Sequence, residues 1–92
     1  DLLFLDGAKE LAIEGIMPGG TRRNLKSIEK VVSFSEEISE IEQLLSADAQ
    51  TSGGLLISMP MEDAKSYVKK VNGETAIIGQ ITEKKPYLIK VD

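Results

Sequence analysis

The stretch DAQTSGGLLI, residues 48–57, decides how the rest of the chain is arranged. It begins where an amphipathic helical pattern ends and passes through an amide, two hydroxyls and two glycines into an apolar segment. Gly53 and Gly54 can adopt backbone angles closed to other residues, so we expect a tight turn between a helix and a strand. Successive N–H groups in such a turn can form a concavity for an anion. On chemistry alone, a single Gly-Gly pair favours a plain connection without a ligand.

Length and composition limit what the chain can be. Its 92 residues suffice for one small domain with one core. A hydrophobic fraction of 41% and a charged fraction of 28% are typical of a globular protein. The net charge of −4 argues against a nucleic-acid partner, which requires a basic face. No apolar run approaches the ~20 residues that cross a bilayer and no signal peptide is present, so we expect a cytoplasmic protein without a membrane partner.

Cysteine and histidine are both absent, which excludes several kinds of chemistry. The chain has no disulfide, no thiolate or imidazole metal ligand, no cysteine nucleophile and no histidine base. Any catalysis would depend on carboxylates, Lys, Arg, Tyr, hydroxyls or backbone N–H groups. The acidic cluster within residues 36–42 fits the solvated face of a helix, so we expect no metal site here.

Hydrophobic periodicity predicts two helices before residue 32. Asp6 is a suitable N-cap for a helix through about Glu14, and Gly15 fits the left-handed position of a Schellman ending. Thr21 can cap the next helix, in which apolar residues recur at helical spacing. Pro18 separates the two helices, because proline interrupts helical hydrogen bonding.

The middle of the chain predicts a helix between two extended segments. Residues 31–34 fit a short strand or an extended link, and Ser35 can cap a helix over residues 36–46. The apolar run at residues 55–59 is typical of a central strand. Pro60 ends this run and introduces a helix through about Val71.

Two further strands are predicted near the C-terminus. Residues 75–82 are rich in Ile and Thr, and residues 87–91 alternate apolar side chains after a turn at 83–86. We expect these two segments to form an antiparallel hairpin. The whole pattern predicts a single α+β domain, residues 1–92, with α/β layers: a mixed sheet of about four strands flanked by helices.

A second motif, PGGTRRN at residues 18–24, precedes this central stretch. It places Gly19 and Gly20 at the start of a helix, where free N–H groups and positive partial charge suit a phosphate. Arg22 and Arg23 stand in the first turns, where cations are normally disfavoured, and arginine is a good phosphate clamp. The alternative is that both arginines extend into water or pair with carboxylates.

Together the two motifs resemble signatures of the selenophosphate synthetase (selenide, water dikinase) family. DAQTSGGLL is similar to that family's DPQTSGGLL, with Ala49 in place of proline, and PGGTRRN is similar to its PGGTRRN segment. The order and spacing of the motifs also agree. Alanine makes the loop less rigid than proline would, but it removes no functional group. The resemblance covers about residues 6–81.

The resemblance implies that the chain is most of the C-terminal domain of a longer, two-domain enzyme. That domain would have the fold of the aminoimidazole ribonucleotide synthetase-like superfamily. The family makes selenophosphate, AMP and phosphate from ATP, selenide and water with Mg²⁺, and its members are typically homodimers. Its catalytic Cys or Sec, its Lys and its metal-binding aspartates lie in the N-terminal domain. The resemblance therefore implies no catalytic residue in this chain, the chain's own N-terminal domain as partner, and no activity of the piece alone.

The resemblance also suggests which residues form the site. We expect two loops to line a cleft that faces the ATP phosphates and small-molecule substrates. Their members are Gly19, Gly20, Thr21, Arg22, Arg23, Gln50, Thr51, Ser52 and Gly53. Asn24 and Asp48 are expected to orient these loops rather than to touch substrate.

Two other functions remain open at this point. One is a related ATP-dependent synthetase or kinase of the same superfamily with a different acceptor, such as a thiamin-phosphate kinase or a hydrogenase-maturation enzyme. A non-enzymatic α+β module that binds a small anion or mediates association would explain the glycine-rich turns without catalysis.

Overall fold

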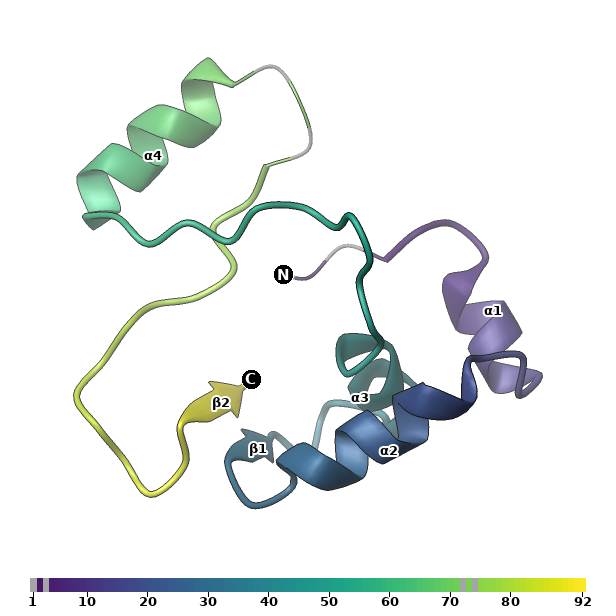
Figure 1. Ribbon diagram of the computed structural model, residues 1–92. Coiled ribbons are helices and arrows are strands. Elements are labelled where there is room, and N and C mark those ends of the chain that lie inside the picture. The colour runs from purple at the N-terminus through teal and green to yellow at the C-terminus, as the bar shows by residue number, and fades with distance from the viewer. Residues whose placement is uncertain (1, 3, 72, 74) are drawn as a thin grey trace.

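The computed structural model describes residue 2 and residues 4–71, 73 and 75–92. Within them the elements are α1 (Ala8–Ile13), α2 (Gly19–Ile28), β1 (Val32–Phe34), α3 (Glu40–Ser46), α4 (Met61–Lys70) and β2 (Ile89–Val91). Figure 1 shows this order along the chain. The α+β class predicted from the sequence is confirmed, but the sheet is smaller than expected.

The sheet consists of two parallel strands from opposite ends of the chain. Val32 of β1 lies opposite Ile89 of β2, and Phe34 lies opposite Val91. Backbone hydrogen bonds extend the pairing at both ends, from the Leu88 N–H to the Val31 carbonyl and from the Ser35 N–H to the Val91 carbonyl, each 2.8 Å. The predicted antiparallel hairpin is therefore wrong, because residues 89–91 pair with β1 instead.

The prediction of about four strands is also wrong for the described residues. Residues 55–59 and 75–82 form no strand, and the structure contains only the β1–β2 pair. A strand is stabilised by hydrogen bonds to a neighbour and by cross-strand side-chain pairs, and neither segment has a neighbour here. Their apolar pattern is a property of the sequence alone, whereas pairing depends on a second segment.

Two helices begin at residues other than the predicted caps. The N-cap of α1 is Gly7, with a left-handed φ of 81°, and not Asp6. The N-cap of α2 is Pro18, so Thr21 lies inside the helix. Proline's fixed φ suits a helix start, so α2 begins directly after it, two residues before the predicted cap. The predicted Schellman ending at Gly15 is confirmed, with φ 79° and a 2.8 Å hydrogen bond from the Ile16 N–H to the Leu11 carbonyl.

The helix α3 begins four residues later than predicted. Its N-cap is Ser39, which forms a reciprocal capping box with Glu42. Two orphan N–H groups are satisfied by this box, whereas the predicted cap, Ser35, accepts only a long 3.4 Å bond from the Glu37 N–H. The C-terminal end of α3 at Ser46 agrees with the prediction.

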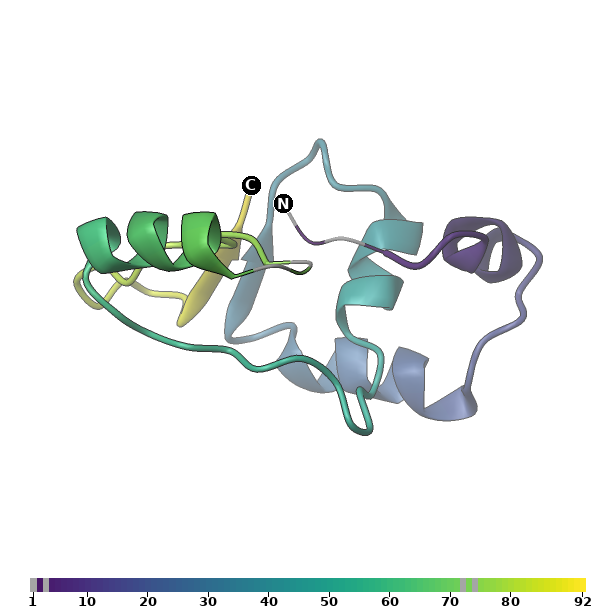
Figure 2. The same cartoon turned by 90° about the horizontal axis from the view of Figure 1, so that it is seen from above.

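The packed part of the molecule is the group of helices α1, α2 and α3 beside the two strands. Helix α3 packs against both α1 and α2, and its Leu44 is buried. Ala12 of α1 and Val32 of β1 are the other buried apolar residues in the described chain. An ion pair between Lys9 and Glu42, 2.7 Å long, also links α1 to α3. Figure 2 shows α3 lying between α1 and the β1 strand.

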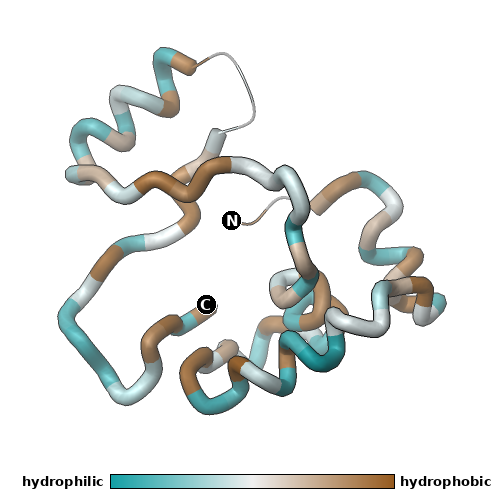
Figure 3. Tube along the Cα trace, viewed as in Figure 1, coloured by the Kyte–Doolittle hydropathy of each residue, from teal (hydrophilic) through white to brown (hydrophobic). Residues whose placement is uncertain are grey.

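The chain after α3 runs in a wide arc through α4 and back to β2 (Figure 1). Helix α4 has no buried residue. Figure 3 shows apolar stretches along this arc on both sides of α4. Each helix in the described part of the chain falls short of the length and hydrophobicity that a transmembrane span requires.

Candidate functional site

The two motifs singled out in the sequence touch each other in the structure. The hydroxyl of Thr21 donates a hydrogen bond to the carboxylate of Asp48, across 27 positions of sequence. The side-chain amide of Asn24 donates to the carbonyl of Ala47 at 3.1 Å. We call these four residues the clasp. The clasp fixes the first turns of α2 against the C-terminal end of α3.

Helical geometry explains why these two α2 side chains act together. Thr21 and Asn24 are three positions apart, so they lie on the same side of the helix. Thr21 is 2% exposed, and Asp48 is half-buried. A hydroxyl and a carboxylate removed from water need partners, and here each serves the other. That Asn24 and Asp48 orient the loops stays a prediction.

The glycine-rich turn after the clasp adopts a different backbone from the one predicted. Ser52 has the left-handed φ, at 58°, and neither Gly53 nor Gly54 has a positive φ. Gly53 is required for another reason: a Cβ there would lie 2.9 Å from the Cβ of Gln50. The Gly53 backbone therefore lies too close to the Gln50 side chain to leave room for a Cβ. Its residues 50–54 are all exposed.

The start of α2 offers unobstructed backbone. A Cβ added at Gly19 or Gly20 would meet no atom within 4 Å, so packing does not demand glycine at either position. No side chain caps the N-terminus of this helix. Gly19 and Gly20 thus stand at the start of a helix, as predicted, and anion binding at its positive end stays a prediction.

The two arginines extend into solvent. Both Arg22 and Arg23 are exposed, and no carboxylate of the described residues lies within 4.0 Å of either guanidinium. The alternative that they pair with neighbouring carboxylates is not observed in this part of the chain. Each remains able to bind a negative group supplied from outside.

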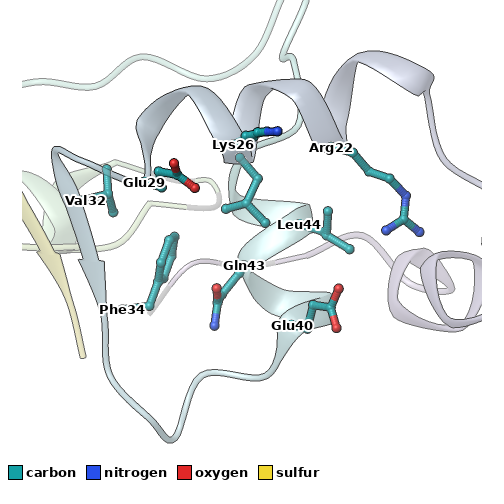
Figure 4. A pocket seen from close by; sticks show the side chains of 9 residues that line it. Arg22, Lys26, Glu29, Val32, Phe34, Glu40, Gln43 and Leu44 are labelled. Atoms are coloured by element: carbon teal, nitrogen blue, oxygen red, sulfur yellow. The ribbon is translucent and has the colours of Figure 1, made fainter.

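Arg22 also borders a shallow cavity of about 520 Å³ between α2, α3 and β1 (Figure 4). Side chains of three elements line it. They are Arg22, Leu25, Lys26, Glu29, Val32, Phe34, Glu40, Gln43 and Leu44. Sequence reasoning missed this cavity, because it depends on how the helices pack. The one feature of the sequence that indicates it is the helical spacing of Arg22 and Lys26 in α2 and of Glu29, the C-cap of that helix.

The structure thus brings together only some of the predicted site residues. Thr21 and Asn24 meet Asp48 in the clasp. Arg22 lines the cavity, which includes none of residues 50–53. The other predicted members are Gly19, Gly20, Arg23 and the exposed turn. Only the backbone connects them to the clasp.

Comparison with curated proteins supports the family resemblance. A selenide, water dikinase from Aliarcobacter butzleri is 42% identical over 85 residues, which cover 88% of this chain and 25% of that protein. One from Myxococcus xanthus is 42% identical over 79 residues, with 83% and 22% covered. One from Caldanaerobacter subterraneus is 40% identical over 92 residues, with 96% and 26% covered.

The chain spans about a quarter of the length of these relatives. No protein-family model matches it, and no solved structure matches it. The sequence resemblance to selenide, water dikinases is therefore confirmed over most of this chain, while most of each relative has no counterpart in it.

Proposed function

We propose that the chain is the C-terminal part of a selenophosphate synthetase, an enzyme that makes selenophosphate, AMP and phosphate from ATP, selenide and water. The similarity to selenide, water dikinases over 83–96% of the chain supports this assignment. The observation that carries the site is the clasp, which joins the two family-like motifs although they lie far apart in sequence. The complete domain would have the aminoimidazole ribonucleotide synthetase-like fold.

In this proposal the chain provides one wall of the nucleotide site. ATP supplies the transferred phosphoryl group when it is bound. Gly19 and Gly20 would let the phosphates approach the N–H groups at the start of α2, and nothing occupies the space beside them. Arg22 and Arg23, which have no carboxylate partner in the described chain, would neutralise phosphate charge.

The exposed turn would complete this wall. Gln50, Thr51 and Ser52 offer an amide and two hydroxyls to solvent, and Gly53 closes the turn. Thr21 is buried, and its hydroxyl is engaged by Asp48, so its contribution would be to position the loops. These roles are electrostatic stabilisation and positioning, and none requires a proton-transfer group.

The family resemblance implies that the magnesium ligands, the nucleophile and the catalytic lysine lie in the rest of the longer protein, and the proposal places them there. That protein would be a cytoplasmic homodimer, and the 92-residue chain would not turn over ATP by itself.

The sharpest test of the site uses Gly20→Ala in the full-length enzyme. Alanine is the better helix former by about 1 kcal/mol and meets no atom within 4 Å, so α2 should gain stability. If phosphate approaches the backbone here, kcat/KM for ATP should nevertheless fall about 10- to 100-fold. Gly73→Ala, after α4, is a matched control that should leave kcat/KM unchanged, because a Cβ added there also meets no atom within 4 Å.

Two further variants test the side chains. Arg22→Ala and Thr51→Ala should each lower kcat/KM for ATP, and Lys69→Ala on α4 is the control for loss of an exposed cation. Normal kcat and KM in Arg22→Ala, Thr51→Ala and Gly20→Ala with intact folding would exclude the phosphate-facing role. ATP binding without selenide-dependent turnover in the full-length protein would instead favour a related kinase or a binding module.

A further inference from the structure

Two extended stretches of the arc expose apolar side chains to a degree unusual for a folded protein. We call residues 54–59 and 75–82 the open segments. Leu55 is 90% exposed, Leu56 82% and Ile81 79%. Neighbouring apolar residues of this kind normally mark a surface that another part of a protein covers.

The backbone of the open segments is also unpaired. Among the described residues, no backbone hydrogen bond joins either segment to any other part of the chain. Both carry a strand-like sequence: residues 55–59 are apolar except for Ser58, and five of the eight residues 75–82 are Ile or Thr, which are β-branched. They have the composition of interior strands and lack only a neighbour.

The small β1–β2 sheet also indicates that neighbouring strands are missing. Parallel strands occur almost only where both faces of a sheet are covered, and a two-stranded sheet is marginal by itself. Yet Ile89 of β2 is exposed, and so is the adjoining Leu88. The β1–β2 pair has the character of one part of a larger sheet whose remaining strands and cover are missing.

We propose that the open segments are strand-forming surfaces that pair with an extended edge and an apolar face in the part of the longer protein outside this chain. This inference rests on the proposal that the chain is one part of such a protein. Docking would satisfy the free backbone groups by strand addition and bury the side chains of Leu55, Leu56 and Ile81.

A partner within the same polypeptide is favoured over a second copy. About three quarters of the Aliarcobacter relative lies outside the region that matches this chain. A covalently linked partner acts at an effective concentration in the millimolar range, which a separate copy does not reach at ordinary protein concentration. Two copies would also each carry a net charge of −4, which opposes their association.

Hydrogen–deuterium exchange of the full-length protein tests the proposal directly. The amides of residues 54–59 and 75–82 should exchange slower than in an unfolded chain by on the order of 100-fold or more. Helix α4, which is solvent-facing here, provides an internal reference peptide from the same digest. Exchange of both open segments at the unfolded rate, in a protein whose α1–α3 peptides are protected, would overturn the proposal.

Cysteine labelling reports on the side chains independently of the backbone. Leu56→Cys in the full-length protein should react with a maleimide much more slowly in the native state than in urea. Glu62→Cys on α4 is the matched control, because the Glu62 side chain is 85% exposed. Equal, fast labelling at both positions would contradict burial of Leu56.

Both measurements are repeated over a range of protein concentrations. Protection that is constant with dilution supports the intramolecular partner. Protection that appears only as the concentration rises would assign the open segments to a second copy and overturn the proposal. None of these readouts involves ATP, so a failed assignment of the phosphate site and a failed assignment of this surface are distinguishable.

Discussion

Thr21 is the only buried polar residue in the part of the chain that the structure describes. Thr21→Val keeps the shape of the side chain but leaves the half-buried Asp48 carboxylate without its donor. We expect the opening free energy of α2 to fall by about 1–3 kcal/mol, the usual effect of orphaning a polar group. Native-state hydrogen exchange of the full-length protein measures this quantity.

Ser27→Ala is the control for Thr21→Val. The Ser27 hydroxyl is on the same helix, is exposed and bonds only the carbonyl of Asn24, at 2.7 Å. Its removal should change stability by no more than about 0.5 kcal/mol. If Thr21→Val behaves like this control, the clasp does not hold the two motifs together.

The stability of the fold should depend on pH through the ionisation of Glu42. Hydrogen bonds from Lys9, and then from the Ser39 side chain and backbone, lower the pKa of Glu42 from 4.5 to about 2. A lowered folded-state pKa means that the ionised form stabilises the fold above about pH 4.5, and that this contribution is lost as the pH falls towards 2. The full-length protein and its Glu42→Gln variant should therefore differ in stability at pH 7 and converge near pH 2.

Urea denaturation at a series of pH values, followed by circular dichroism, checks the Glu42 prediction. Glu62→Gln is a suitable comparison, because Glu62 pairs only with Lys65 on the exposed side of α4. That variant measures the effect of removing an exposed carboxylate that makes a single ion pair. A constant difference between wild type and Glu42→Gln from pH 7 to 2 would show that the Lys9–Glu42 link is not formed.

At the scale of single elements, the N-cap of α3 is Ser39, four residues after the predicted cap, Ser35. Ser39→Ala removes the side chain that caps the helix, so the opening free energy of α3 should fall by about 1 kcal/mol. Ser35→Ala removes the cap predicted from the sequence, whose bond to the Glu37 N–H is 3.4 Å long, and should have a much smaller effect. The reverse order would place the start of α3 at the predicted position. Hydrogen exchange of the α3 peptide decides between them.

Helices could be predicted from the sequence because their determinants are local. Gly15 ends α1 as expected, and Pro60 directly precedes α4, since a glycine or proline acts on its own turn of the chain. The exact starts could not be predicted, because several residues compete for each cap. The same limit applies to the candidate site. Its residues could be named from the sequence, but the contacts of the clasp could not, because they depend on packing between α2 and α3.

Strand pairing was the least predictable part of the fold. Residues 89–91 were expected to pair with their sequence neighbour, yet β2 joins β1 from the far end of the chain. Apolar alternation identifies a segment that favours a strand but carries no information about its partner. For residues 55–59 the partner is absent from the described chain altogether, so the strand is not formed.

At the scale of the whole molecule, the amount of buried apolar surface determines how the isolated chain should behave. Only Ala12, Val32 and Leu44 are buried apolar residues in the described chain, although 41% of the sequence is hydrophobic. We expect the purified 92-residue chain to unfold over a broad range of urea, with an m-value below the ~1 kcal/mol/M of small cooperative domains, because m scales with the surface exposed on unfolding.

The full-length protein is the comparison for this last prediction. If the rest of the polypeptide covers the open segments, circular dichroism should show a steep cooperative transition for the complete protein and a shallow one for the chain alone. A dye that binds exposed apolar surface should likewise bind the isolated chain and not the complete protein. A steep transition with an ordinary m-value in the isolated chain would mean that it buries a core of its own, because cooperative unfolding requires side chains that lose their environment together.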